Sequence, residues 1–151
     1  MILKYGNGFI SRELFESTLK ELNIVPPKGY WEIVSTNDGG SPITSLFEVI
    51  DIDDNEMLVH TLGRFLSFIS TGYDNILELH KDPPEFFPEG LVAFAEDGGG
   101  NLICFDYREG KDNPNPPVVY WNHEADIGKD VSFIAKDFET FIGMLKSDDE
   151  L

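Results

Sequence analysis

Two apolar segments joined by a glycine-rich turn constrain the fold of this chain more than any other feature of its sequence. Leu91–Glu96 (LVAFAE) and Asn101–Tyr107 (NLICFDY) are strand-like, and Asp97–Gly100 (DGGG) lies between them. Glycine adopts positive φ without steric cost, so a short glycine-rich loop can reverse an extended chain. The pattern therefore predicts an antiparallel hairpin.

Further strands are indicated on both sides of this hairpin. Thr44–Ile52 is β-branched and apolar, and Val118–Trp121 follows a proline-rich loop as a third strand after the hairpin. Residues 53–73 have apolar side chains at helical spacing, but Gly63 and Gly72 interrupt them, so the pattern leaves their structure open.

Helical periodicity appears near both ends of the chain and in its middle. Ser11 is a candidate N-cap for a helix that stops at Asn23, and the proline pair Pro26-Pro27 opens a second helix. Asp74 and Asp137 are the candidate N-caps of two later helices. The apolar positions that define these four helices are Leu14, Phe15, Leu19 and Leu22; Tyr30, Trp31 and Val34; Ile76, Leu77 and Leu79; and Phe138, Phe141, Ile142 and Leu145.

This order of elements predicts an α+β fold: one domain over residues 1–151, with a mostly antiparallel central sheet flanked by helices. Because side chains alternate along a strand, we expect Val92 and Phe94 on one face and Ala93 and Ala95 on the other.

The composition is sufficient for such a core. Hydrophobic residues make up 41% of the chain and include 12 Phe, so a domain of this length needs no disulfide or metal to fold. Cys104 is the one cysteine, which excludes an intrachain disulfide, and its apolar neighbours predict a buried, inert thiol. The aromatic residues expected in the core are Trp31, Phe94, Phe105, Trp121 and Phe138.

The charge balance restricts the classes of partner that the chain can bind. Asp and Glu number 28 against 11 Lys and Arg, which gives a net charge of −17 at pH 7. Such a field opposes binding to nucleic acid and to anionic membranes, and it favours a basic protein partner. Solubility alone is the competing explanation of the charge. The first residues lack the apolar segment of a signal peptide and no membrane-spanning run follows, so we expect a cytoplasmic location.

Two patterns invite a ligand, and both are better explained without one. Asp51, Asp53 and Asn55 match the first three ligand positions of a calcium loop, but Glu56 and Leu62 stand where the required glycine and closing glutamate belong. A solvated acidic turn is the preferred interpretation. The glycines of Asp97–Gly100 could hold an anion, but acidic neighbours would repel it, so we interpret them as a hairpin turn. We expect no cofactor and no metal.

His123 and Glu124, with Asp126 two residues further on, form the cluster that most resembles a catalytic centre. A histidine beside carboxylates can act as a general base. The preferred alternative is a strand-end histidine with ordinary hydrogen bonds, since no nucleophile or metal motif accompanies it. The sequence therefore predicts a protein that is not an enzyme.

Four segments in order resemble the SUKH superfamily: VPPKGYWEIVSTNDGG, FFPEGLVAFAEDGGGNLICFDY, PPVVYWNHE and SFIAKDFETFIGML. The resemblance covers residues 14–145, although 53–80 carry little of it. Val25 stands where the family pattern has Leu, and Pro27 is additional. The superfamily includes fungal regulators of cell-wall synthesis and many bacterial immunity proteins, which bind and neutralise toxins that are often nucleases. The resemblance implies an α+β fold and a role without catalysis.

Three functions follow as alternatives. The first is an immunity protein that neutralises a basic toxin domain; the second is a regulatory interaction module linked to cell-wall synthesis or growth control. The third is a small hydrolase built around His123 and Glu124. The candidate partner-binding residues lie at the expected ends of the sheet; they are Asp97, Asn101, Asp106, His123, Glu124 and Asp126. In the alternative interpretation, Asp97 and Asn101 only support the turn and Asp106 only binds nearby backbone groups.

Overall fold

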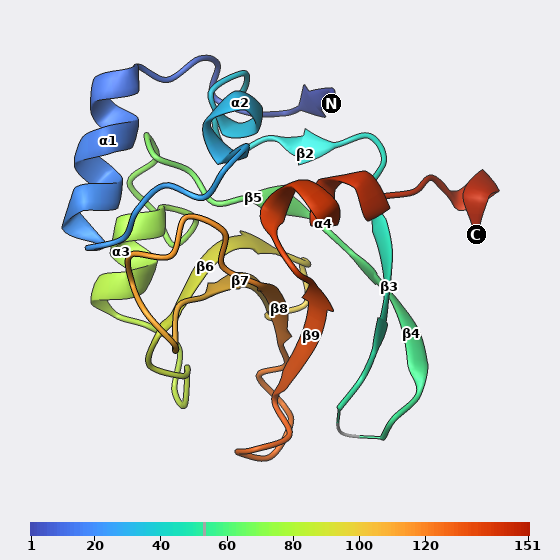
Figure 1. Ribbon diagram of the computed structural model, residues 1–151. Coiled ribbons are helices and arrows are strands. Elements are labelled where there is room, and N and C mark those ends of the chain that lie inside the picture. Colours follow the sequence, from blue (N-terminus) through green and yellow to red (C-terminus); the bar gives the residue numbers. More distant parts are fainter. Residues whose placement is uncertain (53) are drawn as a thin grey trace.

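The computed structural model describes residues 1–52 and 54–151, which form the predicted α+β fold (Figure 1). Its helices are α1 (Arg12–Glu21), α2 (Tyr30–Val34), α3 (Ile76–Lys81), α4 (Phe138–Met144) and a 3-10 helix η1 (Asp148–Glu150). Its strands are β1 (Leu3–Lys4), β2 (Ser41–Pro42), β3 (Leu46–Ile50), β4 (Met57–Thr61), β5 (Arg64–Phe65), β6 (Leu91–Glu96), β7 (Leu102–Asp106), β8 (Val118–Trp121) and β9 (Val131–Ala135).

The central sheet has five antiparallel strands in the order β5-β6-β7-β8-β9. The predicted hairpin forms its middle, and a β-bulge between Ala93 and Ala95 interrupts the register of β6. Ala93 lies opposite Cys104 but Ala95 lies opposite Ile103, on the other face of β7. The expectation that the two alanines share a face is therefore wrong, because the bulge inserts one residue between them.

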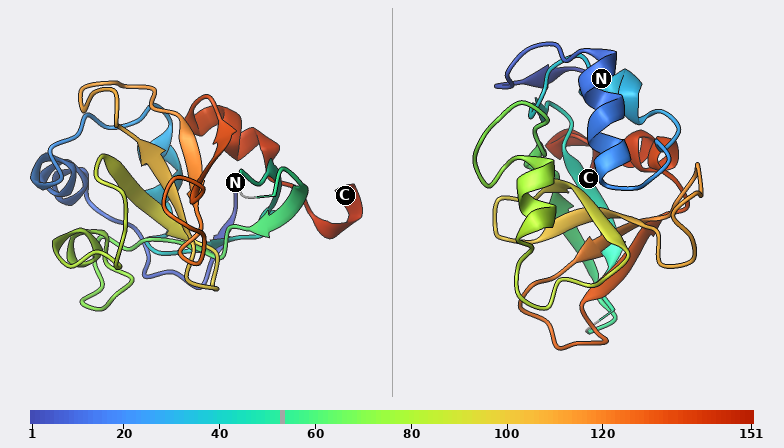
Figure 2. Two further views of the ribbon diagram at one scale, coloured as in Figure 1. Left: turned by 90° about the horizontal axis from the view of Figure 1, so that it is seen from below. Right: turned by 90° about the vertical axis from the view of Figure 1, so that its left-hand side faces the viewer.

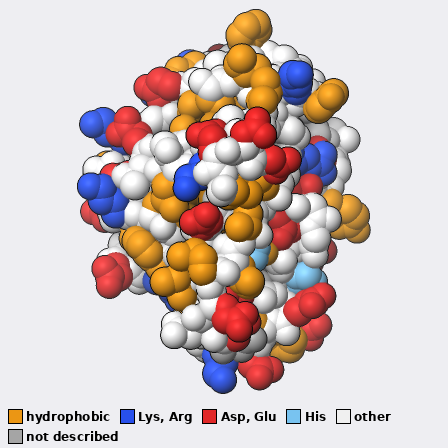
Figure 3. All heavy atoms as spheres, turned by 90° about the vertical axis from the view of Figure 1, so that its right-hand side faces the viewer, with side chains coloured by type: hydrophobic (Ala, Val, Ile, Leu, Met, Phe, Trp, Pro, Cys, Tyr) orange, Lys and Arg blue, Asp and Glu red, His pale blue; other side chains and the backbone are white. Residues whose placement is uncertain are grey.

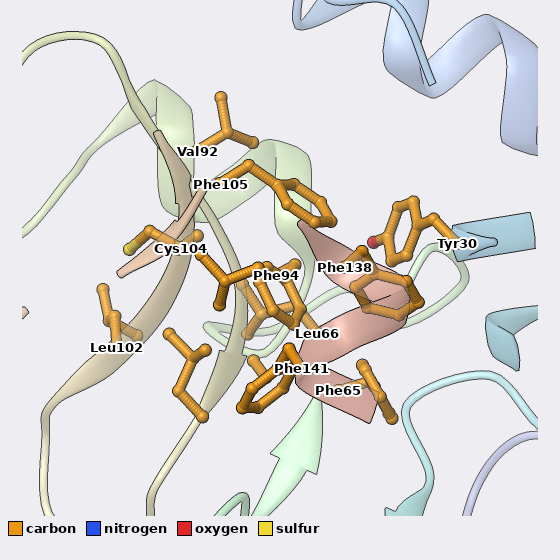
Figure 4. Packing of buried hydrophobic residues seen from close by; sticks show 14 of the residues in the cluster. Tyr30, Phe65, Leu66, Val92, Phe94, Leu102, Cys104, Phe105, Phe138 and Phe141 are labelled. Carbon is orange, nitrogen blue, oxygen red and sulfur yellow. The ribbon is translucent and has the colours of Figure 1, made fainter. Parts of the chain in front are cut away.

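The three inner strands of this sheet, β6, β7 and β8, are covered on both faces, which explains why they are almost entirely apolar. On one face, Phe94 stacks on Phe105 with ring centroids 4.2 Å apart, and Phe138 of α4 packs edge-on against both (Figure 4). On the other face, Phe87 packs against Trp121 at 5.1 Å. Figure 2 shows α1 and α3 on the side of the sheet away from the hairpin β3–β4.

The aromatic core agrees with its prediction except at one residue. Phe94, Phe105, Trp121 and Phe138 are at most 1% exposed. Trp31 is only half-buried, because it lies at the edge of the core under the guanidinium of Arg12, 5.0 Å from its ring centroid.

The single thiol also lies where it was expected. Cys104 is fully buried, and this burial raises the pKa of its thiol well above the ordinary value. The thiolate is therefore disfavoured, and the predicted burial of the thiol is confirmed.

The helix ends confirm most of the predicted caps. Ser11 accepts a hydrogen bond from the Leu14 N–H, and Asp137 accepts one from the Thr140 N–H. The predicted cap of α3 is wrong by one residue: Asn75, not Asp74, accepts from two backbone N–H groups of the helix. Asp74 instead accepts a hydrogen bond from the Ser70 hydroxyl.

A second hairpin, β3–β4, lies outside the central sheet and beside β9 (Figure 1). The predicted strand Thr44–Ile52 is confirmed as β3, and the Ile52 N–H donates to the Ser132 hydroxyl of β9 at 2.9 Å. The segment left open becomes β4 and β5 rather than a helix. The apolar spacing there reflects a chain that passes from the hairpin to the edge of the sheet, where Phe65 is buried.

Two smaller findings complete the fold. The strand β9 has no counterpart among the sequence-based predictions. No helix in the described part of the chain combines the length and apolarity needed to cross a membrane.

Candidate functional site

The turn Asp97–Gly100 is organised by the carboxylate of its first residue. Asp97 accepts hydrogen bonds from the backbone N–H groups of Gly99 (2.7 Å) and Asn101 (3.1 Å). It also accepts from the Asn101 side-chain amide at 3.0 Å and from the Tyr120 hydroxyl at 2.7 Å. The backbone N–H of Gly99, which could have bound an anion, thus donates to the carboxylate of Asp97.

These bonds set the acidity of the cluster. Partial burial raises the pKa of Asp97, but the hydrogen bonds from Tyr120, Asn101 and Gly99 outweigh it, and the net pKa lies below the ordinary value. Burial, together with the bond to Asp97, raises the pKa of the Tyr120 hydroxyl. Asp97 is therefore an ionised acceptor and Tyr120 a neutral donor at physiological pH.

Asn101 connects this turn to the loop that follows β8. Its side-chain oxygen accepts from the His123 backbone N–H at 3.1 Å and contacts the His123 ring Nδ1 at 2.7 Å. A Cβ atom at Gly100, where φ is +93°, would lie 2.9 Å from the same ring. Glycine is therefore required there by both the backbone conformation and the packed imidazole.

Glu124 and Asp126 continue the loop and are exposed. Glu124 approaches the His123 Nε2 at 3.6 Å, with its side chain 82% exposed, so this contact is a weak surface ion pair at best. Asp126 takes part in the loop's own turn through its backbone carbonyl, which accepts from the Lys129 N–H at 2.9 Å. Both carboxylates face solvent and are accessible to a partner.

Five of the six predicted site residues thus gather at one end of the sheet, and Asp106 does not. Asp106 ends β7 at the opposite end from Asn101, and its carboxylate binds both the backbone N–H and the guanidinium of Arg108 at 2.9–3.0 Å. Its partners make it a brace for the loop after β7, as the structural alternative expected.

Sequence reasoning missed two residues of this cluster. The ring of His60, from β4, stacks on Tyr120 with centroids 4.1 Å apart, which joins the second hairpin to the Asp97 turn. Desolvation lowers the pKa of His60, although the nearby Asp97 and Asp51 oppose this. The two residues lie 60 positions apart, so no local pattern could have paired them.

The cluster offers little for catalysis. His123 makes the ordinary hydrogen bonds of a strand-end histidine, as predicted. Within residues 1–52 and 54–151, no group of three or more His, Cys, Asp or Glu side chains could hold a metal ion. Asp51 and Asn55 lie in the turn of β3–β4, whereas Asp53, the third residue of the calcium-loop comparison, lies outside the described residues. What the cluster presents outward is negative charge.

Fold and site together define a small, acidic α+β domain whose polar clusters hold loops in place and leave carboxylates exposed. A sequence model of the SMI1 / KNR4 family (SUKH-1) matches residues 10–144. The chain therefore belongs to that family, and the predicted resemblance to the SUKH superfamily is confirmed.

One curated relative gives a narrower comparison. A SPbeta prophage-derived uncharacterized protein, YokK of Bacillus subtilis (strain 168), is 37% identical over 57 residues. The matching segment is 37% of this chain and 27% of that protein, so the chain spans well under two thirds of the relative's length. No solved structure matches the chain.

Proposed function

We propose that this chain is a protein-binding domain of the immunity type, which neutralises a basic toxin domain by occupying its functional surface. The net charge of −17 within a SUKH-1 domain is the observation that carries this proposal. The similarity to a prophage-derived protein is consistent with an immunity-type role.

The physical argument rests on complementary charge. A nuclease holds its phosphate substrate with lysine and arginine, so its active face is strongly basic. An acidic protein competes for that face and associates quickly because opposite fields steer the encounter. No catalytic step is assigned to the chain: its role is to cover a surface.

The direct test uses the polypeptide encoded in the reading frame next to this gene. Its C-terminal domain is expressed alone and together with this chain in the cytoplasm of a bacterial host, and survival is scored. We expect growth arrest by the domain alone, protection by this chain, and binding of the purified inactivated domain. Arrest without protection or binding would overturn the proposal and favour a regulatory interaction module.

Exposed carboxylates at the site provide a finer test. The double variant Glu124→Gln/Asp126→Asn should associate about threefold to tenfold more slowly with the inactivated domain at low salt, with the difference shrinking as salt rises. The control Glu21→Gln/Asp112→Asn removes the same charge from exposed positions elsewhere. If both variants slow association equally, net charge alone steers the encounter and these two residues have no special part in it.

A further inference from the structure

The outer face of the β3–β4 hairpin carries apolar side chains around Glu48, which lies opposite Val59, although nothing in the described structure covers it. Ile50 lies directly opposite Met57, and their exposed fractions are 55% and 59%. Val59, two residues along β4 on the same face, is 48% exposed. An antiparallel hairpin with one solvated face normally alternates apolar and polar residues, and this one does not.

The backbone of β4 is also open along one edge. The Asp51 N–H donates to the Glu56 carbonyl and the Leu62 N–H to the Ser45 carbonyl, which fixes the alternation of the ladder between them. By that alternation, the backbone N–H and C=O groups of Met57, Val59 and Thr61 point away from β3. In the described part of the chain β4 pairs with β3 alone. The edge carries no lysine, proline or bulge of the kind that protects exposed strands.

The apolar surface continues from the hairpin on to the central sheet. Phe133 of β9 is 62% exposed, and with Ile50, Ile52 and Met57 it lines a groove of about 450 Å³ between hairpin and sheet. We call Ile50, Ile52, Met57, Val59 and Phe133 the hairpin face. Figure 3 looks onto this side of the molecule, where hydrophobic and acidic side chains are interspersed and most Lys and Arg side chains lie near the rim.

The charge of the hairpin selects the occupant. Residues 46–61 contain no lysine or arginine; among their acidic residues Asp54 and Glu56 are exposed and Glu48 is partly exposed, whereas Asp51 is buried. A second copy of this chain would bring the same charge to the same place, in addition to its net −17. Like charges facing each other across an interface are repulsive, so a basic surface with an apolar centre is the better complement.

We propose that the hairpin face is the docking surface for a basic protein domain, whose apolar side chains cover Ile50, Met57 and Val59 while its cations meet the surrounding acids. This deepens the proposed function and rests on it. The His60–Tyr120 stack places the hairpin next to the Asp97 turn and its loop. Glu124 and Asp126 then lie toward the rim and affect mainly association, whereas the hairpin face affects dissociation.

The test is the triple variant Ile50→Thr/Met57→Thr/Val59→Thr, measured against the inactivated domain used above. Threonine keeps the strand propensity and removes apolar surface without changing charge. We expect an affinity loss of about tenfold or more, mainly through faster dissociation. The control Ile2→Thr/Val25→Thr/Ile69→Thr alters three other exposed apolar residues, and it should lose less than about twofold.

The possible results separate the two proposals. If the unchanged protein does not bind the domain, the proposed function fails first. If it binds and the triple variant binds equally well with its fold intact, the hairpin face is not the docking surface and the proposed function stands. If the unchanged protein dimerises alone and the triple variant is monomeric, a second copy covers the face, which also overturns the inference.

Hydrogen exchange gives an independent measurement on the unmodified protein. The amide protons of Met57, Val59 and Thr61 should exchange more slowly when the inactivated domain is bound. Protection confined to the α1 and α3 side of the molecule would contradict the docking surface.

Discussion

The hairpins β6–β7 and β3–β4 are built alike and buried differently. Each joins two apolar strands through an acidic turn, yet β6–β7 is enclosed on both faces while β3–β4 is covered on one. In the first, apolar residues on both faces are explained by the core. In the second, the outer apolar residues Ile50, Met57 and Val59 remain about half exposed, and the proposed docking surface accounts for them. Comparable patterns of hydrophobicity therefore have different physical meanings in the two places.

The largest expected effect is the loss of unfolding free energy when a core side chain of β6–β7 is truncated. Phe94 is fully buried between Phe105 and Phe138, so Phe94→Ala leaves a cavity and should cost about 3–5 kcal/mol of unfolding free energy. Chemical denaturation measures this loss. Phe9→Ala is the control, since Phe9 is 84% exposed and should change stability by less than about 0.5 kcal/mol. Similar losses for both would mean that the sheet is not enclosed as described.

The turn of β6–β7 should contribute next. The Asp97 carboxylate accepts four hydrogen bonds. In Asp97→Asn, the side-chain NH₂ would replace the oxygen that accepts from the Tyr120 hydroxyl and the Asn101 amide, so that donors would face a donor. We expect a loss of about 1–3 kcal/mol in unfolding free energy at pH 7. Asp112→Asn, at an exposed position, is the matched control. A neutral result for Asp97→Asn would show that the turn is held by its glycines alone.

The titration of two histidines, one packed against β6–β7 and one within β3–β4, makes the unfolding free energy depend on pH. His80 braces β6: its Nε2 accepts from the Ala93 N–H at 3.0 Å, and its Nδ1 lies 2.7 Å from the Ile76 carbonyl. Burial lowers the pKa of His80 below 6.5, because the charged ring is poorly solvated and its protonated Nε2 cannot accept. The folded state thus favours the neutral ring. Its stabilising contribution is complete above the unfolded pKa and is lost as pH falls below about 6.5.

Unfolding free energies measured between pH 7.5 and 5 test this. His80 contributes at most about 1.4 kcal/mol per pH unit to the decline. The total decline should therefore be smaller in His80→Gln, which keeps an acceptor but does not titrate. His60 in β4 has a lowered pKa too, so part of the slope should persist in that variant. An unchanged slope in His80→Gln would assign the whole effect elsewhere.

Much of the first hairpin could be predicted from sequence, because its determinants are local. The glycine turn, the strand limits of β6 and β8, and the caps Ser11 and Asp137 all depend on neighbouring residues. The bulge between Ala93 and Ala95 could not be predicted, since no glycine or other local signal marks it within Leu91–Glu96.

In the second hairpin, β3 could be predicted but β4 could not, because no local signal marks where β4 begins. The turn before β4 contains no glycine, and the helical spacing of Leu62, Phe65 and Leu66 comes from the segment after it. At the candidate site, Asp97, Asn101 and His123 could be named from the sequence, but the stack of His60 on Tyr120 depends on tertiary structure. One usable signal was overlooked: apolar residues on both faces of 46–50 and 57–61, without a cation between them.

The smallest expected effect is on the stability of the hairpin face itself. Ile50, Met57 and Val59 are about half exposed, so their replacement by threonine removes little buried surface and should change the unfolding free energy by about 0.5 kcal/mol or less per site. Denaturant titration of the triple variant, beside the Ile2/Val25/Ile69 control, measures this. A combined loss above about 3 kcal/mol would mean that these side chains hold the hairpin against β9, and their apolar character would then need no partner. A near-neutral result means that the fold does not depend on these three exposed side chains. A loss of affinity for the toxin domain in the same variant then reports lost docking and not unfolding.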